Sequence, residues 1–122
     1  MERLTQPEEE AMQVLWQLNG GFTKDVLDLL PEPKPPYTTL ASTIRNLERK
    51  GYVRGEKLGN SYRFAPQLAA EEYRQQFMSA FVSEYFKNSY KEVVSFFAKD
   101  EKISAAELQE IIRMIENRQT ED

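Results

Sequence analysis

Apolar residues recur at helical spacing near the start of the chain and predict a first helix. The stretch QPEEEAMQVLWQL follows Thr5, and a threonine before a proline and several glutamates is typical of a helix N-terminus. Its apolar positions follow the i, i+3, i+4, i+7 pattern that places them on one side of a helix. They are Ala11, Val14, Leu15 and Leu18. The next residues, Asn-Gly-Gly, are typical of a helix C-terminus.

Two further helices are predicted on either side of a proline-rich segment. Thr23 is expected to cap a short helix, KDVLDLL, which a proline closes. Four of the six prolines lie in residues 31–36, which predicts a stiff, non-helical connection. A disordered linker is the alternative, but the segment is short and lies between amphipathic helices. The third helix is predicted from Tyr37 to Lys50, with Gly51 as its stop signal.

A β-hairpin is predicted after the third helix. Tyr52 begins a strand, residues 58–61 (LGNS) have the composition of a hairpin tip, and Pro66 ends the returning strand. Phe22, between the first two helices, is a candidate for a very short strand. Three helices followed by a hairpin form the arrangement of a winged helix-turn-helix. We therefore expect such a domain over residues 1–67.

The rest of the chain, residues 68–122, is predicted to form three helices. The first runs from about Leu68 to Asn88, and Ser89 is placed to cap the second. Ser104 with Glu107 has the spacing of a capping box and begins the third. The expected fold class is mainly α with a small β-hairpin wing: a winged helix-turn-helix domain and a C-terminal helical dimerisation domain.

The C-terminal helices carry more apolar and aromatic residues than three short helices easily enclose. Large exposed apolar patches usually mark an interface, and a second copy related by a two-fold axis is the expected partner. The residues predicted for this dimerisation surface are Phe77, Phe81, Tyr85, Tyr90, Val94, Phe97, Leu108, Ile111, Ile112 and Ile115. A ligand pocket lined by aromatic side chains is the alternative, although no charged residue falls clearly within the stripe.

The third predicted helix has an unusual outer face. With about 100 degrees of rotation per residue, Leu40, Ile44 and Leu47 form a narrow buried side. The opposite side carries short hydroxyls near its N-terminal end and arginines behind them, although hydroxyl residues are mediocre helix formers. Slim side chains at the leading end let a helix backbone approach DNA closely in the major groove.

We therefore predict that this face reads DNA. Arg45 is the candidate for a bidentate contact with guanine, and Arg49 for a phosphate contact. The hairpin tip is expected to reach the flanking backbone or minor groove, whereas Tyr62 either donates to a phosphate or packs beneath the wing. The predicted DNA-binding residues are Thr38, Thr39, Ser42, Arg45, Asn46, Arg49, Lys57, Asn60, Ser61, Arg63 and, more weakly, Lys24. The alternative is an ordinary solvated helix face with Thr38 as its N-cap.

Charge distribution supports a local DNA footprint despite a net charge of −4. Residues 36–66 carry six basic and two acidic groups, whereas residues 1–35 carry three and seven. Residues 67–122 carry seven and eleven, so the three segments sum to −4, +4 and −4. A basic middle between acidic flanks is more informative than the overall balance.

Catalysis and metal binding are not expected. The chain has no cysteine and no histidine, which removes disulfides, thiolate metal sites and the commonest general base. No cofactor is indicated. The acidic N-terminus, MERLTQPEEE, lacks the apolar core of a signal peptide, and no apolar run is long enough to span a membrane. A cytoplasmic protein is the expectation.

Two stretches of the chain, EAMQVLWQLNGGFTKDVLDLLPE and YTTLASTIRNLERKGYV, carry a recognisable pattern. They and, more loosely, the helices that follow resemble the penicillinase repressor family (BlaI, MecI and CopY type), so the similarity covers nearly the whole chain. It implies a dimeric repressor that blocks promoters, with an N-terminal winged helix and a C-terminal dimerisation domain. Carried over by position, Thr38, Thr39, Ser42, Arg45 and Asn46 would face the DNA.

Two departures from the family pattern bear on how such a repressor is released. The copper-responsive branch has a cysteine-rich site, and this chain has no cysteine. The β-lactam-responsive branch is cleaved at an Asn-Phe bond, and the corresponding stretch here reads VVSFFAKD. Cleavage near Ser95, Phe96 and Phe97 by a membrane sensor protease encoded nearby remains an alternative, although the usual Asn-Phe bond is missing here.

The leading hypothesis is a sequence-specific transcriptional repressor that binds a palindromic operator as a homodimer. Its recognition helix, about 37–50, would enter the major groove, and its wing, about 52–65, would lie on the flanking backbone. The alternative is a winged-helix protein-interaction module that does not bind DNA, which the acidic flanks favour. An enzyme is a distant third hypothesis.

Overall fold

The computed structural model describes residues 2–121, with side chains to residue 118, and divides into two compact units. The units are Met1–Gln75 and Gln76–Asp122. The described residues form six helices and a small three-stranded antiparallel sheet. The predicted fold class, mainly α with a small β-hairpin wing, a winged helix-turn-helix and a helical C-terminal part, is therefore confirmed. No helix among the described residues combines the length and apolar character needed to cross a bilayer.

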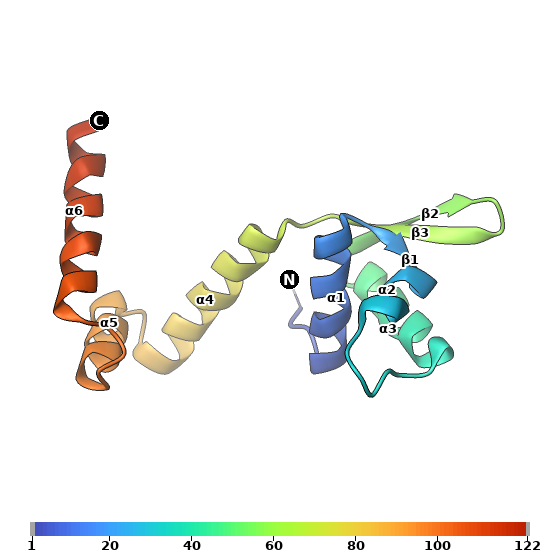
Figure 1. Cartoon of the computed structure of the whole chain (residues 1–122), viewed down its shortest axis with the longest axis horizontal. Helices are drawn as coiled ribbons and strands as arrows, with labels where there is room; N and C mark the ends of the chain where they lie inside the picture. Colours follow the sequence, from blue (N-terminus) through green and yellow to red (C-terminus); the bar gives the residue numbers. More distant parts are fainter. Residues whose placement is uncertain (1, 122) are drawn as a thin grey trace. The chain divides into compact units, whose positions relative to one another are not determined.

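Three helices surround the core of the first unit (Figure 1). They are α1 (Gln6–Leu18), α2 (Thr23–Leu29) and α3 (Tyr37–Arg49). Each contributes apolar side chains at helical spacing, and the largest fully buried ones in this unit are Met12, Leu15, Val26, Ile44 and Leu47. Burying side chains of this size contributes about 1.5–3 kcal/mol each. The hydrophobic pattern read from the sequence is thus the pattern of burial.

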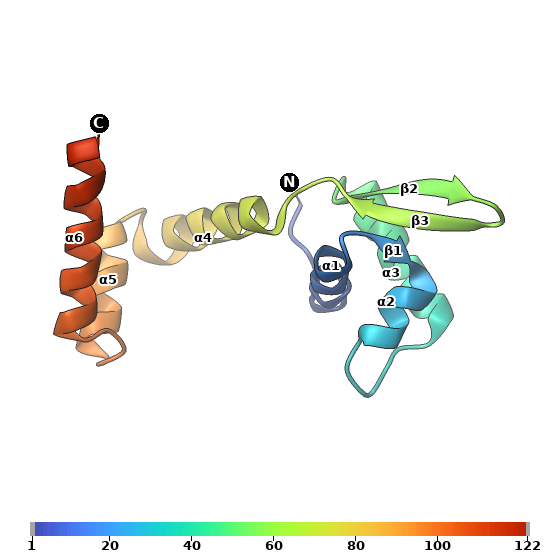
Figure 2. The same cartoon turned by 45° about the horizontal axis from the view of Figure 1, so that its top comes forward.

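The sheet contains the strands β1 (Gly21–Phe22), β2 (Val53–Leu58) and β3 (Ser61–Pro66) in the order β1-β3-β2. Leu58 pairs with Ser61, so Gly59 and Asn60 form the hairpin turn, and Gly59 has a φ of 65°. Both the hairpin tip and the very short strand at Phe22 are confirmed. Figure 2 shows the β2–β3 hairpin extending beyond the helices as a wing.

Two helix starts show where local sequence signals succeed and fail. Thr5 caps α1 through a capping box, since its amide donates to Glu8 Oε1 at 2.9 Å and its hydroxyl accepts from the Glu8 amide. The expected cap at Thr23 is wrong. Phe22 is the N-cap of α2, and its amide donates to Asp25 Oδ2 at 3.0 Å. Pairing of β1 with β3 keeps the chain extended only to Phe22, and Thr23 is buried as the first helical residue.

The proline-rich connection is held to α2 by a lysine. The Lys34 ammonium donates to the carbonyl oxygens of Leu27, Asp28 and Leu30 at 2.9, 2.9 and 2.8 Å. These carbonyls belong to the last turn of α2, where intrahelical donors run out. The segment is therefore an ordered connection between α2 and α3.

The C-terminal helices are α4 (Ala70–Phe86), α5 (Tyr90–Lys99) and α6 (Ala105–Glu121). The Ser89 hydroxyl accepts from the Glu92 amide at 3.2 Å, which confirms the cap of α5. Ser104 and Glu107 exchange hydrogen bonds of 3.0 and 3.1 Å, which confirms the capping box before α6.

The first turn of α4 packs against the first unit's own core. Trp16 Nε1 donates to the Leu68 carbonyl at 2.7 Å, and the Trp16 and Tyr73 rings meet edge-on at 5.4 Å. Burial, with a further contribution from the Glu9 carboxylate, raises the pKa of Tyr73 to about 12. Trp16 therefore has a packing role at the start of α4.

Candidate nucleic-acid interface

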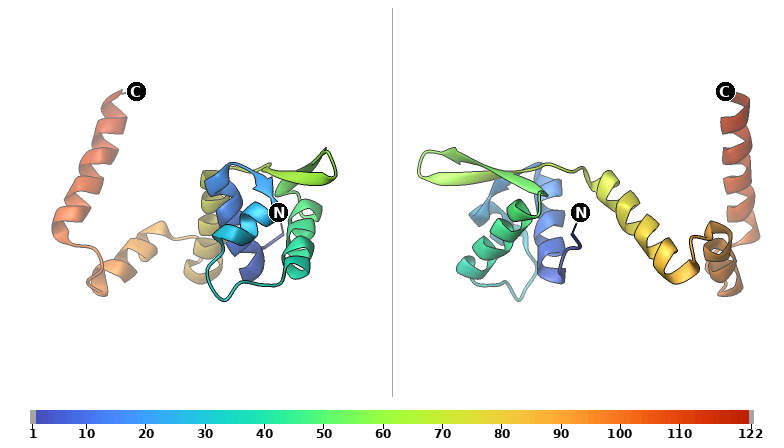
Figure 3. Two further views of the ribbon diagram at one scale, coloured as in Figure 1. Left: turned by 45° about the vertical axis from the view of Figure 1, so that its right-hand side comes forward. Right: turned by 180° about the vertical axis from the view of Figure 1, so that it is seen from behind.

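The α3 helix has one buried side and one exposed polar side. Leu40, Ile44 and Leu47 are at most 2% exposed and join the core. The opposite side exposes Thr38, Ser42, Arg45 and Arg49, and Thr39 and Asn46 are exposed at one margin of it. The two views in Figure 3 show α3 at the outer edge of the first unit, below the wing. The division of faces deduced from helical geometry is the one observed.

The hydroxyls at the start of α3 are not used to cap the helix. Pro36 is the N-cap and makes no side-chain bond, so the alternative of Thr38 as a cap is wrong. Thr43 donates its hydroxyl to the Thr39 carbonyl at 3.0 Å. Within the described residues, the hydroxyls of Thr38 and Ser42 have no hydrogen-bond partner. They are therefore available to an external acceptor or donor.

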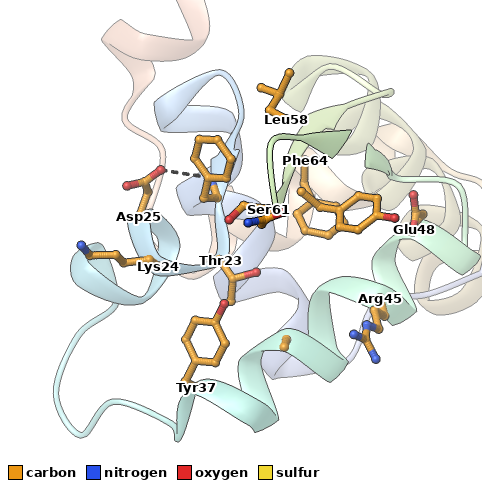
Figure 4. A pocket seen from close by; sticks show the side chains of 13 residues that line it. Thr23, Lys24, Asp25, Tyr37, Arg45, Glu48, Leu58, Ser61 and Phe64 are labelled. Atoms are coloured by element: carbon orange, nitrogen blue, oxygen red, sulfur yellow. Dashed lines mark hydrogen bonds between the residues drawn. The ribbon is translucent and has the colours of Figure 1, made fainter. Parts of the chain in front are cut away.

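A groove of about 990 Å³ lies between the first turn of α2, α3 and the hairpin tip. Four predicted DNA-binding residues line it, namely Lys24, Arg45, Asn60 and Ser61. Figure 4 shows Arg45 on α3, Lys24 on α2, and the Tyr37 ring reaching from the start of α3 toward Thr23. The fold thus brings these four residues, separated by up to 37 positions in the sequence, to one concave surface, which the carboxylates of Asp25 and Glu48 also line.

Two other predicted cations lie elsewhere. Arg63 donates to the Asn19 carbonyl at 3.0 Å and covers Gly20, where a Cβ atom would lie 2.8 Å from the guanidinium. Its guanidinium thus holds β3 to the end of α1. Lys57 is exposed on the wing outside the groove lining.

Arg49 and Tyr62 lie at the margins of the surface. The Arg49 guanidinium lies 3.8 Å from the Glu2 carboxylate, and both side chains are mostly exposed. The pair is therefore too weak to hold Arg49 away from another anion. Tyr62 is half-exposed, lines the groove, and its ring lies 6.5 Å from that of Phe64.

The stretch LERKGY, at the end of α3, holds the surface in place. Lys50 Nζ donates to Glu8 Oε1 at 2.6 Å and to the Arg3 carbonyl at 3.0 Å, and both side chains of the ion pair are buried. Burial raises the pKa of Glu8, but hydrogen bonds from Lys50 and Thr5 outweigh it, so the pKa lies below its usual value. Sequence reasoning missed this pair because the partners are 42 positions apart.

The same stretch ties α3 to the wing. The Glu48 carboxylate accepts a hydrogen bond of 2.7 Å from the Gly55 amide of β2. The Tyr52 hydroxyl donates to the Glu2 carbonyl at 2.6 Å, which also holds this stretch to the N-terminal residues. Figure 4 shows Glu48 on the side of α3 that faces Phe64 and the hairpin. The amphipathic pattern of α3 could mark Glu48 as exposed, but nothing local in the sequence indicates its partner.

The second unit leaves much of its apolar surface exposed. Among the predicted dimerisation residues Phe81 and Leu108 are half-buried, and the others are exposed in the single chain. Neither α5 nor the part of α6 with described side chains contains a buried residue. Aromatic rings pack on one another, with centroids of Phe81 and Tyr85 5.0 Å apart and those of Phe86 and Phe96 5.8 Å apart.

The stretch considered for cleavage lies within α5. Ser95 is half-buried, whereas Phe96 and Phe97 are 54% and 37% exposed. The peptide bonds between these three residues lie within the α5 helix.

Comparison with known proteins decides the family. Residues 4–117 match the penicillinase repressor family. The chain belongs to the penicillinase repressor family. This family consists of DNA-binding repressors of transcription, so the resemblance found in the sequence is confirmed.

A curated relative extends the comparison without adding a function. An uncharacterized 16.5 kDa protein in the ptsI 3' region of Latilactobacillus sakei is 31% identical over 74 residues. The match covers 57% of this chain and 50% of that protein. The chain thus spans about half the length of the curated relative it matches.

Proposed function

We propose that this penicillinase repressor family protein binds a palindromic operator as a homodimer, with α3 in the major groove and the β2–β3 wing on the flanking backbone. The observation that carries the proposal is the polar side of α3, whose slim hydroxyls and arginines are exposed. A helix that presents such a face can bring its backbone close to base edges. The groove beside it adds Lys24 and the hairpin tip.

Each predicted contact has a role that fits its position. Thr38, Thr39 and Ser42 approach phosphates or base edges at the leading end of α3, and Asn46 offers an amide beside them. Arg45, which has no ion-pair partner among the described residues, contacts guanine. The phosphate contacts come from Lys24, Arg49, Lys57, Asn60 and Ser61, whereas the Arg63 guanidinium, also predicted to bind DNA, is bonded to the Asn19 carbonyl.

The apolar surface of residues 77–115 supports the homodimer. Side chains such as Tyr85, Ile112 and Ile115 are more than half exposed in the single chain, and a soluble protein rarely leaves a contiguous patch of this kind uncovered. A two-fold axis pairs each patch with its equivalent on the second copy. Such a dimer presents two α3 helices to two half-sites of an operator.

Binding to selected DNA at several salt concentrations tests the proposal. A duplex is first selected from a randomised library with the full-length chain, and its Kd is then measured by electrophoretic shift. We expect a palindromic consensus and an affinity that falls steeply with salt, because phosphate contacts release counterions. A folded dimer that selects no duplex at low salt would instead support a winged-helix module that binds protein.

A further inference from the structure

Gly55 lies where the wing comes closest to α3. It is in β2, an edge strand of the sheet, and pairs with Phe64 of β3. Its amide donates to Glu48 Oε2 at 2.7 Å. An edge strand has amides on its open side that no neighbouring strand accepts from, and here a carboxylate of α3 accepts the hydrogen bond of one of them.

No side chain fits at this position without displacing a neighbour. A Cβ atom on Gly55 would lie 2.9 Å from Glu48 Oε2 and 3.0 Å from Cε1 of Phe64. Phe64 is buried in the core, so its ring has little freedom to retreat. The glycine therefore serves the close approach of the two elements.

Glu48 is an unexpected residue on this surface. It is one of only two acidic residues among the eight charged ones of residues 36–66, and it lines the same groove as Arg45, one helical turn away. A free carboxylate there would repel DNA phosphates. The hydrogen bond from Gly55 directs this charge at the wing backbone, which gives the acidic side chain a role that a neutral or basic residue could not fill as well.

We propose that Glu48 and Gly55 are positioning residues that fix the wing relative to the recognition helix. They set the distance between the bases that Arg45 reaches and the phosphates that Lys57 reaches, so both contacts are made at once only when the Glu48–Gly55 contact is intact. The consequence for DNA rests on the proposed function. The mechanical part of the proposal, that the contact holds the wing to α3, is independent of it.

A distance measurement without DNA tests the mechanical part. The chain has no cysteine, so Thr38→Cys and Asn60→Cys can carry a pair of spin labels, one on α3 and one at the wing tip. We expect a narrow distance distribution that broadens or shifts in Glu48→Ala and in Gly55→Ala. Glu56→Ala is the matched control, since it removes an equal charge from the adjacent, exposed position of β2 and leaves the distribution unchanged. Identical distributions in all four chains would overturn the proposal.

A double-mutant cycle on the selected duplex tests the consequence for DNA. We expect Gly55→Ala and Glu48→Ala each to weaken binding about tenfold, and Lys57→Ala to have little further effect in either background. In the unmodified background Lys57→Ala should lower the slope of log Kd against log salt by about 1. Glu48→Gln keeps an oxygen acceptor and should recover part of the loss. Full additivity, with unchanged thermal stability, would overturn this part of the proposal.

The two experiments distinguish failure of the positioning role of the Glu48–Gly55 contact from failure of the proposed function. If the unmodified chain selects no duplex, the proposed function is wrong, and the spin-label distances still decide whether Glu48 and Gly55 hold the wing. If the duplex binds but the cycle is additive, the function stands and the positioning role for DNA is wrong.

Discussion

Arg45 and Glu48 lie one turn apart on α3 and have opposite fates in the structure. Glu48 is bound to a backbone amide of the wing, whereas Arg45 makes no ion pair with any described residue. A long cationic side chain loses rotamer entropy when it is immobilised, and an unpaired arginine has not yet incurred this cost. In the groove, its five N–H donors remain available for a ligand. We therefore expect separate roles for the two residues, DNA contact for Arg45 and positioning of the wing for Glu48.

Arg45→Ala should weaken binding to the selected duplex by about 1–3 kcal/mol and relax discrimination at one base pair. The reason is the loss of a bidentate contact that only guanine supplies fully. Arg49→Ala is the matched control and should weaken all sequences alike. Titration of both variants against the duplex and its single-base variants measures this. An equal loss from Arg45→Ala on random DNA would show a phosphate contact instead.

The buried Glu8–Lys50 pair makes stability depend on pH in the acid range. The pKa of Glu8 in the folded chain lies below its ordinary value of 4.5, so the carboxylate stabilises the fold above that pH. This contribution is lost as the pH falls through the folded-state pKa. Urea unfolding between about pH 6 and pH 3 should show the decline.

Glu8→Gln should abolish the part of this decline that Glu8 contributes. The variant should also lose about 3 kcal/mol at neutral pH, because it leaves the Lys50 ammonium buried without its counter-charge. Glu10→Gln, at an exposed position of the same helix, is the control and should change neither quantity appreciably. A pH profile for Glu8→Gln parallel to that of the unmodified chain would contradict the assignment.

At the scale of elements, short-range patterns predict most of the fold. The buried side of α3, the caps at Thr5, Ser89 and Ser104 and the hairpin tip all depend on residues within about four positions of one another, which is the range of helix and turn signals. The exceptions depend on distant partners. Strand pairing with β3 moves the start of α2 to Thr23, and Arg63 is drawn to the Asn19 carbonyl.

The candidate site divides in the same way. Helical geometry alone assigns the exposed face of α3, because that face is local. The contacts that hold this face in register, Glu48 with Gly55 and Lys50 with Glu8, join separate elements. Their partners were not predictable, since charge pairing across elements follows from tertiary packing. The stretch YTTLASTIRNLERKGYV thus combines the predicted recognition residues, which lie on one local helix face, with residues that bond to distant parts of the chain.

The connection between α2 and α3 gives a prediction about an element. Lys34→Met should lower the free energy of unfolding by about 1–2 kcal/mol, because three carbonyls at the end of α2 lose their donor. Lys24→Met is the matched control, since Lys24 is exposed and makes no hydrogen bond or ion pair with another described residue. Urea denaturation compares them. Equal stability of the two variants would show that solvent replaces the Lys34 ammonium without cost.

For the whole molecule, charge and apolar surface are segregated along the chain. Only residues 36–66 carry a net positive charge, and both flanking segments are net negative. We therefore expect DNA to be attracted to the basic segment and repelled by the acidic ones, which would favour approach to the first unit through α3 and the wing. The exposed apolar side chains lie outside that segment for the most part, in residues 77–115. If the proposed function holds, mutations should alter DNA recognition and the proposed self-association separately.

Ile112→Glu tests the self-association. Ile112 is 52% exposed on α6, so a charge there disturbs little within one chain but would be buried in the proposed dimer. An unpaired buried charge is costly, so the variant should have about half the solution mass of the unmodified protein at low concentration. Asn117→Glu, on the opposite side of α6 by helical geometry, adds the same charge and should keep the dimer mass. Light scattering measures both.

Because a monomer engages one half-site, Ile112→Glu should also lose most of its affinity for the palindrome while a single half-site binds as before. A full-mass Ile112→Glu variant would place the dimer contact on another surface.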